Sequence, residues 1–149
     1  ENVSVIDQNS GVNNMAEVLQ EGNRDHRADV VQTRGWNNDA FVEQRWGGYN
    51  DADITQIDGR NNDADIYQFG HRATADILQS GGSNNRAFIE QESNLDGARA
   101  DIVQVRGSSN EAYIFQEGGS DWSTKVNDNV ALINQTDGSN NTAITTQIK

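Results

Sequence analysis

Glutamine recurs along this chain with a period that few folds can use. Its twelve glutamines are spaced by 11 to 13 residues, apart from one gap of 19 residues between Gln116 and Gln135. Alanine stands four residues before the glutamine in eleven of twelve cases, and Ser4 is the exception. Ile or Val stands two residues before it in eleven cases, and Thr145 is the exception. Self-similarity at a fixed period indicates a repeat architecture in which each unit packs on its neighbours.

The spacing inside each repeat predicts a short β-strand. Residues two apart lie on one face of an extended strand, whereas a helix would scatter Ala, Ile/Val and Gln around its axis. One such strand cannot bury its face alone, so successive units must stack. Glycine marks the turns between strands, and we expect a positive φ there. It follows the glutamine by three residues at Gly11, Gly35, Gly47, Gly59, Gly82, Gly107, Gly119 and Gly138, and by two at Gly22 and Gly70.

Asparagine six residues before the glutamine distinguishes alternate strands. All six even-numbered strands carry it, whereas the odd-numbered strands carry Asn, His26, Ala73 or Ala98. The unit is therefore a pair of unequal strands, about 24 residues long. The sequence predicts an all-β fold, a β-solenoid with two strands per turn, about six turns and two facing parallel sheets, able to stack as cross-β structure into fibres.

The repeats cover the whole chain. Residues 1–149 are expected to form one domain of twelve half-repeats, or six strand-turn-strand repeats. The long gap adds a short insertion near 120–126, which we interpret as a tolerated loop. Trp122 and Lys125 are its candidates for a specific contact.

The inward positions of such a coil form vertical ladders of Asn, Ala, Ile/Val and Gln. Stacked amides can satisfy one another from rung to rung, which makes a buried amide part of a continuous network. The predicted amyloid-core ladder consists of Gln8, Gln20, Gln32, Gln44, Gln56, Gln68, Gln79, Gln91, Gln104, Gln116, Gln135 and Gln147, with Asn14, Asn38, Asn62, Asn85, Asn110 and Asn141.

The outward faces of the two sheets differ. One carries a like-charge column, which costs stability unless it is paired or solvated; we interpret it as a solvated face, with a cation-binding column as the alternative. The other carries aromatic residues, interpreted as stacking on the sheet, with lateral contact between fibres as the alternative. Opposite charges on neighbouring rungs would help to fix the register. These three groups are Asp29, Asp53, Asp76 and Asp101; Phe41, Tyr67, Phe88, Tyr113 and Phe115; and Asp63, Arg86 and Glu111.

Composition excludes several classes of function. A net charge of −12 disfavours binding to nucleic acid or to anionic membranes, and no apolar run is long enough for a membrane span. We expect no enzyme, cofactor or metal site, because His26 occupies a ladder position, His71 a turn, and no nucleophile motif is present. A calcium-dependent solenoid would need a glycine-rich nonapeptide that the sequence lacks. An ice-binding solenoid would need a regular threonine array, and the threonines here are scattered.

The ends of the repeat array are expected to be open. The first predicted strand begins within a few residues of Glu1 and the last ends at Gln147, with no capping element visible between them and the termini. Matching open edges are templates for the addition of another copy, which predicts a head-to-tail homopolymer.

The repeat resembles the curlin repeat of curli, the bacterial functional amyloids. The pattern Gly-x-x-Asn-x-Ala-x-(Ile/Val)-x-Gln stands at residues 11–20 and 82–91 and recurs over nearly the whole chain. The resemblance implies secretion across the outer membrane, a minor nucleator subunit, secretion and chaperone proteins as partners, and assembly in the biofilm matrix. Curlin major subunits usually carry a segment before the first repeat, and almost none precedes Asn2 here.

The predicted function is that of a structural subunit of extracellular curli-type amyloid fibres that support cell adhesion and aggregation. The alternative is a soluble or surface-displayed acidic β-solenoid that acts as a binding module, either an adhesin or a calcium-dependent one, and does not polymerise.

Overall fold

In the part that the structure describes, β-strands joined by turns are the only regular secondary structure. The structure is a computed structural model that describes residues 1–22, 24–118 and 129–148, without the side chains of 93–96. The predicted insertion near 120–126, with Trp122 and Lys125, lies outside these residues, and so does the predicted turn glycine Gly119. The strands are β1 Val3–Asn9, β2 Met15–Glu21, β3 Arg27–Thr33, β4 Asp39–Gly48, β5 Asp51–Ile57, β6 Asp63–His71, β7 Thr74–Ser80, β8 Arg86–Asp96, β9 Arg99–Val105, β10 Glu111–Glu117, β11 Val130–Thr136 and β12 Thr142–Ile148.

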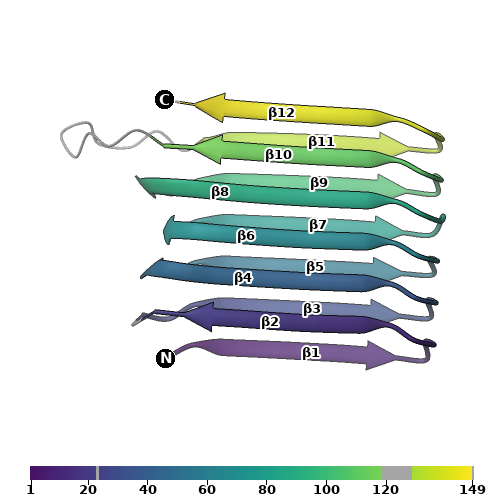
Figure 1. The fold of residues 1–149 in the computed structure, drawn as a ribbon, viewed down its shortest axis with the longest axis horizontal. Coiled ribbons are helices and arrows are strands. Elements are labelled where there is room, and N and C mark those ends of the chain that lie inside the picture. The colour runs from purple at the N-terminus through teal and green to yellow at the C-terminus, as the bar shows by residue number, and fades with distance from the viewer. Residues whose placement is uncertain (23, 119–128, 149) are drawn as a thin grey trace.

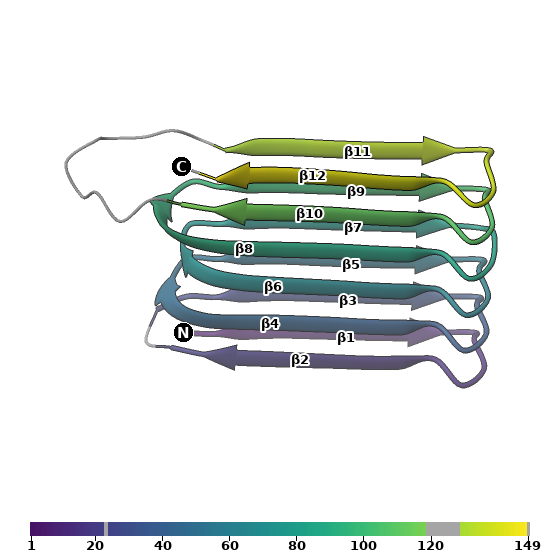
Figure 2. The ribbon, with the colours of Figure 1, turned by 45° about the horizontal axis from the view of Figure 1, so that its top comes forward.

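These strands alternate between two parallel sheets, as the sequence predicts (Figures 1 and 2). The odd sheet has the order β1-β3-β5-β7-β9-β11, and the even sheet has the order β2-β4-β6-β8-β10-β12. Each pair of consecutive strands makes one rung of a β-solenoid. Five turns lead from β1 to β11, and β12 completes the sixth rung. The two ends of the described chain therefore lie at opposite ends of the stack (Figure 1).

The strand register follows the glutamine period. Gln32 pairs with Gln56 in the odd sheet and Gln44 with Gln68 in the even sheet, and alanine and Ile/Val stay in register beside them. The 19-residue gap leaves this pairing intact, because β9 pairs with β11 through Gln104 and Gln135. The gap therefore does not shift the register of the described strands.

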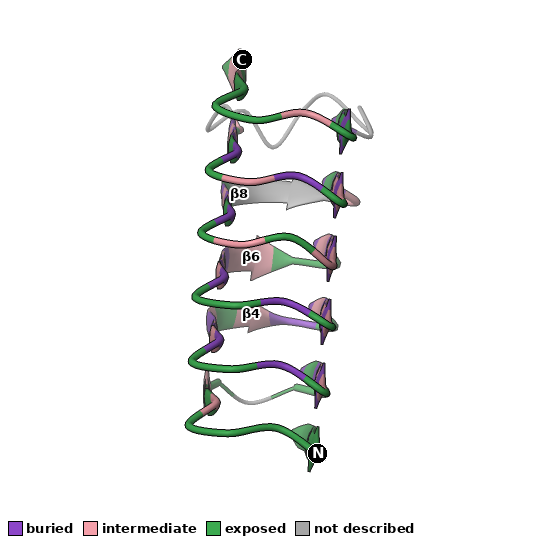
Figure 3. Ribbon diagram, turned by 90° about the vertical axis from the view of Figure 1, so that its right-hand side faces the viewer, coloured by how far each residue is buried: buried purple, intermediate pink, exposed green. Residues whose placement is uncertain are grey.

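The core is a thin layer between the sheets. Its apolar part consists of the predicted Ala and Ile/Val columns, which are 0–6% exposed from Ala28 to Ile133. The inward side chains are more exposed at both ends of the stack, because a terminal rung has a neighbouring rung on one side only. Figure 3 looks along the strands and shows the coil at the N-terminus in the colour of exposed residues.

The glycine in the odd-to-even turns has a different role from the predicted one. A positive φ is present at Gly82 and, in the opposite turns, at Gly22, Gly47 and Gly70. The prediction is wrong for Gly11, Gly35, Gly59, Gly107 and Gly138, which lack it.

Steric space explains these glycines instead. A Cβ on Gly59 would overlap Nδ2 of Asn62, and the same clash recurs in the equivalent turns. The left-handed conformation falls on the neighbouring residues, such as Asp58 (φ 56°) and Asn61 (φ 52°). Asparagine tolerates that conformation better than most residues. The Asn-Asn pairs of the sequence were the signal that could have located it.

Candidate assembly core and its open ends

The glutamine side chains form a continuous hydrogen-bonded ladder in each sheet. In each of the first five rungs Nε2 donates to Oε1 of the glutamine in the next rung towards the C-terminus. The N···O distances are 2.6–2.9 Å from Gln8 to Gln135 in the odd sheet. They are 2.8–3.0 Å from Gln20 to Gln147 in the even sheet. Both ladders therefore have a direction, with acceptors facing one end and donors facing the other.

The same amides also tie the two sheets together. Nε2 of Gln56 donates to the backbone carbonyl of Asp39 at 2.8 Å, and Nε2 of Gln68 donates to that of Asp51 at 2.9 Å. Both carbonyls belong to the first residue of a strand in the opposite sheet. The sequence pattern did not reveal this second bond, since it depends on how closely the sheets approach. Because these glutamines are fully buried, the bonds are shielded from water.

Asparagine forms a second ladder beside the odd-to-even turns. The backbone N–H of Asn62 donates to Oδ1 of Asn38, and that of Asn85 donates to Oδ1 of Asn62, both at 3.1 Å. The Nδ2 of Asn85 donates to the carbonyl of Gly107 in the next turn at 3.1 Å. The structure places the other predicted members in the same series, with Asn14 partly buried and Asn141 exposed at its two ends.

The equivalent ladder position is irregular on the odd strands. Asn50 follows the regular scheme, because its Oδ1 accepts from Ala73 N at 3.0 Å and its Nδ2 donates to the Gly70 carbonyl at 3.1 Å. His26 departs from it: the side chain is 1% exposed, and neither ring nitrogen has a partner among the described residues. Burial lowers the pKa of His26, and the charge of exposed His71 adds to this effect. His26 is a weak point of the core.

The outward aspartates form an in-register column on the odd sheet. Asp29, Asp53, Asp76 and Asp101 are consecutive partners. Arg99 pairs with Asp101 at 2.9 Å, and Arg27 contacts Asp29. Burial, followed by the charges of Asp101 and Asp53, raises the pKa of Asp76 to about 6. The described residues contain no group of three or more His, Cys, Asp or Glu side chains arranged to hold a metal ion.

The outward face of the even sheet alternates aromatic and acidic residues. The predicted aromatic residues lie there, and the rings step diagonally from strand to strand, with centroids 5.4 Å apart for Phe41–Tyr67 and Tyr67–Phe88 and 5.5 Å for Phe88–Phe115. Asp65 lies between Phe41 and Phe88 in the register. Burial raises the pKa of Asp65 to about 6. An aromatic residue thus separates Glu17 from Asp65 and Glu43 from Glu90, whereas Asp39 and Asp63 on the same face are direct partners.

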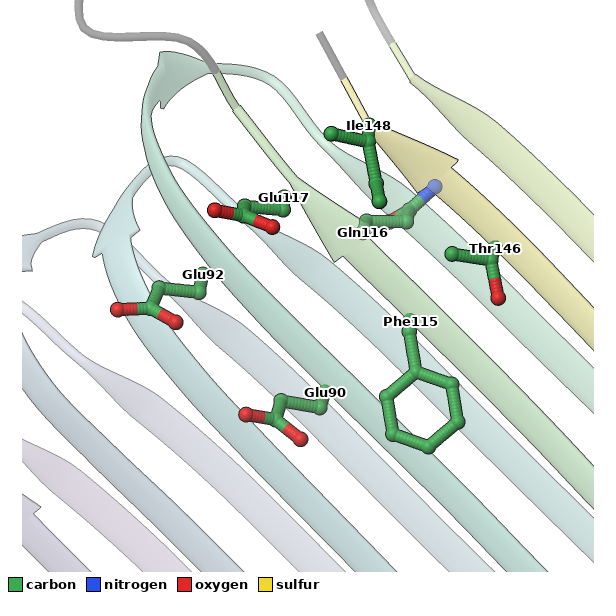
Figure 4. A pocket seen from close by; sticks show the side chains of 7 residues that line it. All are labelled: Glu90, Glu92, Phe115, Gln116, Glu117, Thr146 and Ile148. Atoms are coloured by element: carbon green, nitrogen blue, oxygen red, sulfur yellow. The ribbon is translucent and has the colours of Figure 1, made fainter.

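Two further features of this face concern its charges. Of the predicted register aids, Arg86 pairs with Asp63 at 3.4 Å and faces Glu111 in the register. A shallow hollow of about 110 Å³ lies near the last rungs, where Glu92 is the register partner of Glu117 and Glu90 is that of Phe115 (Figure 4).

Both ends of the core are open in the described structure. The inward-facing Ile6 of β1 is 45% exposed, although the same column is fully buried in the middle of the stack. Within the described residues, no hydrogen bond reaches Oε1 of Gln8. At the other end, Gln135 Nε2 donates to backbone carbonyls, of Glu111 at 3.0 Å and of Asn141 at 3.2 Å, and to no further glutamine. The acceptor end and the donor end are therefore complementary.

Comparison with known proteins identifies the repeat. No helix in the described residues is suited to crossing a membrane. Comparisons with curated proteins and with solved structures gave no significant match. Residues 59–92, which contain β6, β7 and most of β8, match the family model of the curlin associated repeat. This segment shares its ladders and its register with the strands on either side of it, so the matched repeat is continuous with the rest of the described stack.

Proposed function

We propose that this chain is a structural subunit that assembles head to tail into an extracellular curli-type amyloid fibre. The observation that carries the proposal is that the core ladders run through all six rungs and end open on complementary faces. A second copy placed on either end would continue both sheets. Its strands would lie perpendicular to the fibre axis, which is the cross-β arrangement.

The energetic argument concerns the exposed inner face. Addition of a copy would bury Ile6, which is 45% exposed, against the Ile133 column position of the copy below it. It would also pair the free backbone edges of β1 and β11, which are templates for strand addition in any sheet. Each joint repeats the core contacts of an interior rung, so one copy after another can be added without closure.

The curlin repeat supports the biological setting. A curli-related subunit would be secreted across the outer membrane, nucleated by a minor subunit, and handled by dedicated secretion and chaperone proteins. The fibre would serve adhesion and aggregation of cells in a biofilm matrix. We assign the chain a structural role without catalysis or cofactor, because its recurring polar residues serve the ladders.

Assembly can be tested by releasing the purified chain from denaturant at micromolar concentration and following thioflavin fluorescence and electron micrographs. We expect unbranched fibres. The Ser4→Pro variant should assemble more slowly, since Val3 N donates inward to His26 and the alternating pattern turns the Ser4 N–H outward, towards an incoming copy. Ser4→Ala is the matched control, because alanine is the usual residue of that column, and it should assemble like the unchanged chain.

A stable β-rich monomer that never polymerises would contradict the proposal. It would favour the alternative, an acidic β-solenoid that acts as a soluble or surface-displayed binding module. Equal rates for Ser4→Pro and Ser4→Ala would leave fibre formation in place but exclude the β1 edge as a growing surface.

A further inference from the structure

We propose that successive copies join through a specific apolar seam, in which Val130 and Leu132 of one copy stack in register on Val3 and Val5 of the next. The seam rests on the proposed self-assembly and adds the register, the direction and the side chains of the joint. It lies on the outer face of the odd sheet, where β1 and β11 are the edge strands (Figure 1).

The outer face changes from polar to apolar at these two edge strands. The two columns concerned carry charged or polar residues on every interior strand, but only Val or Leu on the edges. Val3 pairs with Arg27 and Val5 with Asp29 at one end of the sheet. At the other end, Val130 pairs with Arg99 and Leu132 with Asp101. The interior residues are Arg27, Asp29, Asp51, Asp53, Thr74, Asp76, Arg99 and Asp101.

The four apolar side chains are exposed in the single copy. Exposure is 48% for Val3, 51% for Val5, 56% for Val130 and 65% for Leu132. Single exposed apolar residues are ordinary, but these occupy matching columns at the two surfaces that a joint would bring together. Continued in the register of the interior rungs, the stack sets Val3 on Val130 and Val5 on Leu132.

Repulsion between like charges also favours apolar residues at this joint. Like charges directly opposite each other on neighbouring strands are destabilising. An aspartate in place of Leu132 would lengthen the column of Asp76 and Asp101 up to the growing end. Interior rungs hold their aspartates within one folded chain, whereas a joint forms from separate copies and gains from apolar contact.

The glutamine ladder fixes the direction of the joint. In the proposed register, Gln135 Nε2 faces the free Oε1 of Gln8, which repeats the bond of 2.8 Å from Gln104 to Gln135. A joint between two β1 edges would set acceptor against acceptor. The seam is therefore formed between unlike ends.

Disulfide trapping tests the register directly, since the sequence contains no cysteine. The double variant Val3→Cys/Val130→Cys is assembled under reducing conditions, then oxidised, denatured and run on a non-reducing gel. β1 and β11 are five rungs apart within one copy, roughly 24 Å at the usual strand spacing. That distance exceeds the reach of a disulfide, so every bond formed links two copies.

The expected result is a covalent series of dimers, trimers and longer chains. Three controls report the other joints: each single variant reports contact between like ends, and Val3→Cys/Thr142→Cys reports stacking with the two sheets exchanged. Dominant cross-linking in any of these would overturn the seam while fibre formation stands. If the unchanged chain forms no fibres, the proposed function itself fails.

A charge variant keeps the seam testable if the cysteine variants do not assemble. Leu132→Asp should slow elongation about fivefold, because it places a charge in the joint beside Asp101. Val5→Arg in the same chain should restore the rate. Val103→Asp makes the same charge change on β9, one strand inside the edge and away from the joint, and should leave elongation unchanged. Equal slowing by Val103→Asp, or no rescue by Val5→Arg, would contradict the seam.

Discussion

Replacing Gln68 by methionine tests whether the buried amides hold the solenoid together. Methionine keeps the unbranched shape and nearly the volume of glutamine but removes its polar atoms. In the structure, Gln68 Oε1 accepts from Gln44 at 2.8 Å, and its Nε2 donates to Gln91 at 3.0 Å and to the Asp51 carbonyl at 2.9 Å. The substitution therefore leaves Oε1 of Gln91 without a donor, takes the side-chain donor from the Asp51 carbonyl, which keeps its ladder bond to β7, and removes one acceptor from Gln44.

The expected cost follows from these groups. A buried polar group left unsatisfied costs about 1–3 kcal/mol. Gln44 Nε2 keeps its bond to the Arg27 carbonyl at 2.8 Å, so its loss is smaller. The gain from burying a thioether in place of an amide offsets part of the total. We expect Gln68→Met to lower the free energy of unfolding by about 2–4 kcal/mol.

The assay is urea unfolding followed by tryptophan fluorescence, at a protein concentration too low for assembly. Gln147→Met is the matched control. This glutamine also accepts from Gln116, but it is only partly buried in the last rung, so water can replace the lost bonds. It should cost less than about 1 kcal/mol. A neutral or stabilising effect of Gln68→Met would show that the ladder is tolerated rather than required, and would refute the reasoning.

Three further predictions concern single positions. His26→Asn should stabilise the fold by about 1 kcal/mol in urea unfolding, because it supplies the donor and acceptor that Asn50 uses in the next rung; equal or lower stability would contradict the ladder account. Gly59→Ala should cost about 1–3 kcal/mol through its clash with Asn62, and a double-mutant cycle with Asn62→Ala should be clearly non-additive. The pKa of Asp76 is raised from 3.8 to about 6, so the folded state binds the proton more readily than the unfolded state and this group adds stability as the pH falls from 7 towards 4. The pKa of His26 is lowered, so the unfolded state binds this proton more readily and the group removes stability as the pH falls below 6.5. In the His26→Asn variant, stability should therefore rise clearly on acidification. Adding Asp76→Asn to that variant should reduce the rise.

The repeated polar and apolar columns made most of the fold predictable from the sequence. Ala, Ile/Val and Gln at spacings of two fixed the strand, its inward face and the register. Asn62 and its equivalents separated the even strands from the odd strands. The cross-strand partners of Gln56 and Gln68 follow directly from that period. Such a prediction succeeds because each rung repeats the same strands, turns and packing contacts with its neighbours.

The remaining features depend on distances between rungs or sheets. The bond from Gln56 to the Asp39 carbonyl requires the gap between the sheets, which no spacing along the chain reveals. Gly59 was correctly placed in a turn, but its reason is the side chain of Asn62 and not its own φ. The apolar edge strands are visible in the sequence at Val5 and Leu132, yet their significance depends on knowing that β1 and β11 lie at the two ends of one sheet.

The axial repeat of the fibre is the most direct test of head-to-tail stacking. Six rungs per copy at about 4.8 Å each predict one subunit every 29 Å or so along the axis. Cryo-electron microscopy of fibres that carry one heavy-atom label per chain would measure this spacing, and oriented diffraction would place the 4.7–4.8 Å reflection along the fibre axis. A label repeat near 29 Å with strands perpendicular to the axis is the expected result. Strands parallel to the axis, or labels without that repeat, would contradict the account.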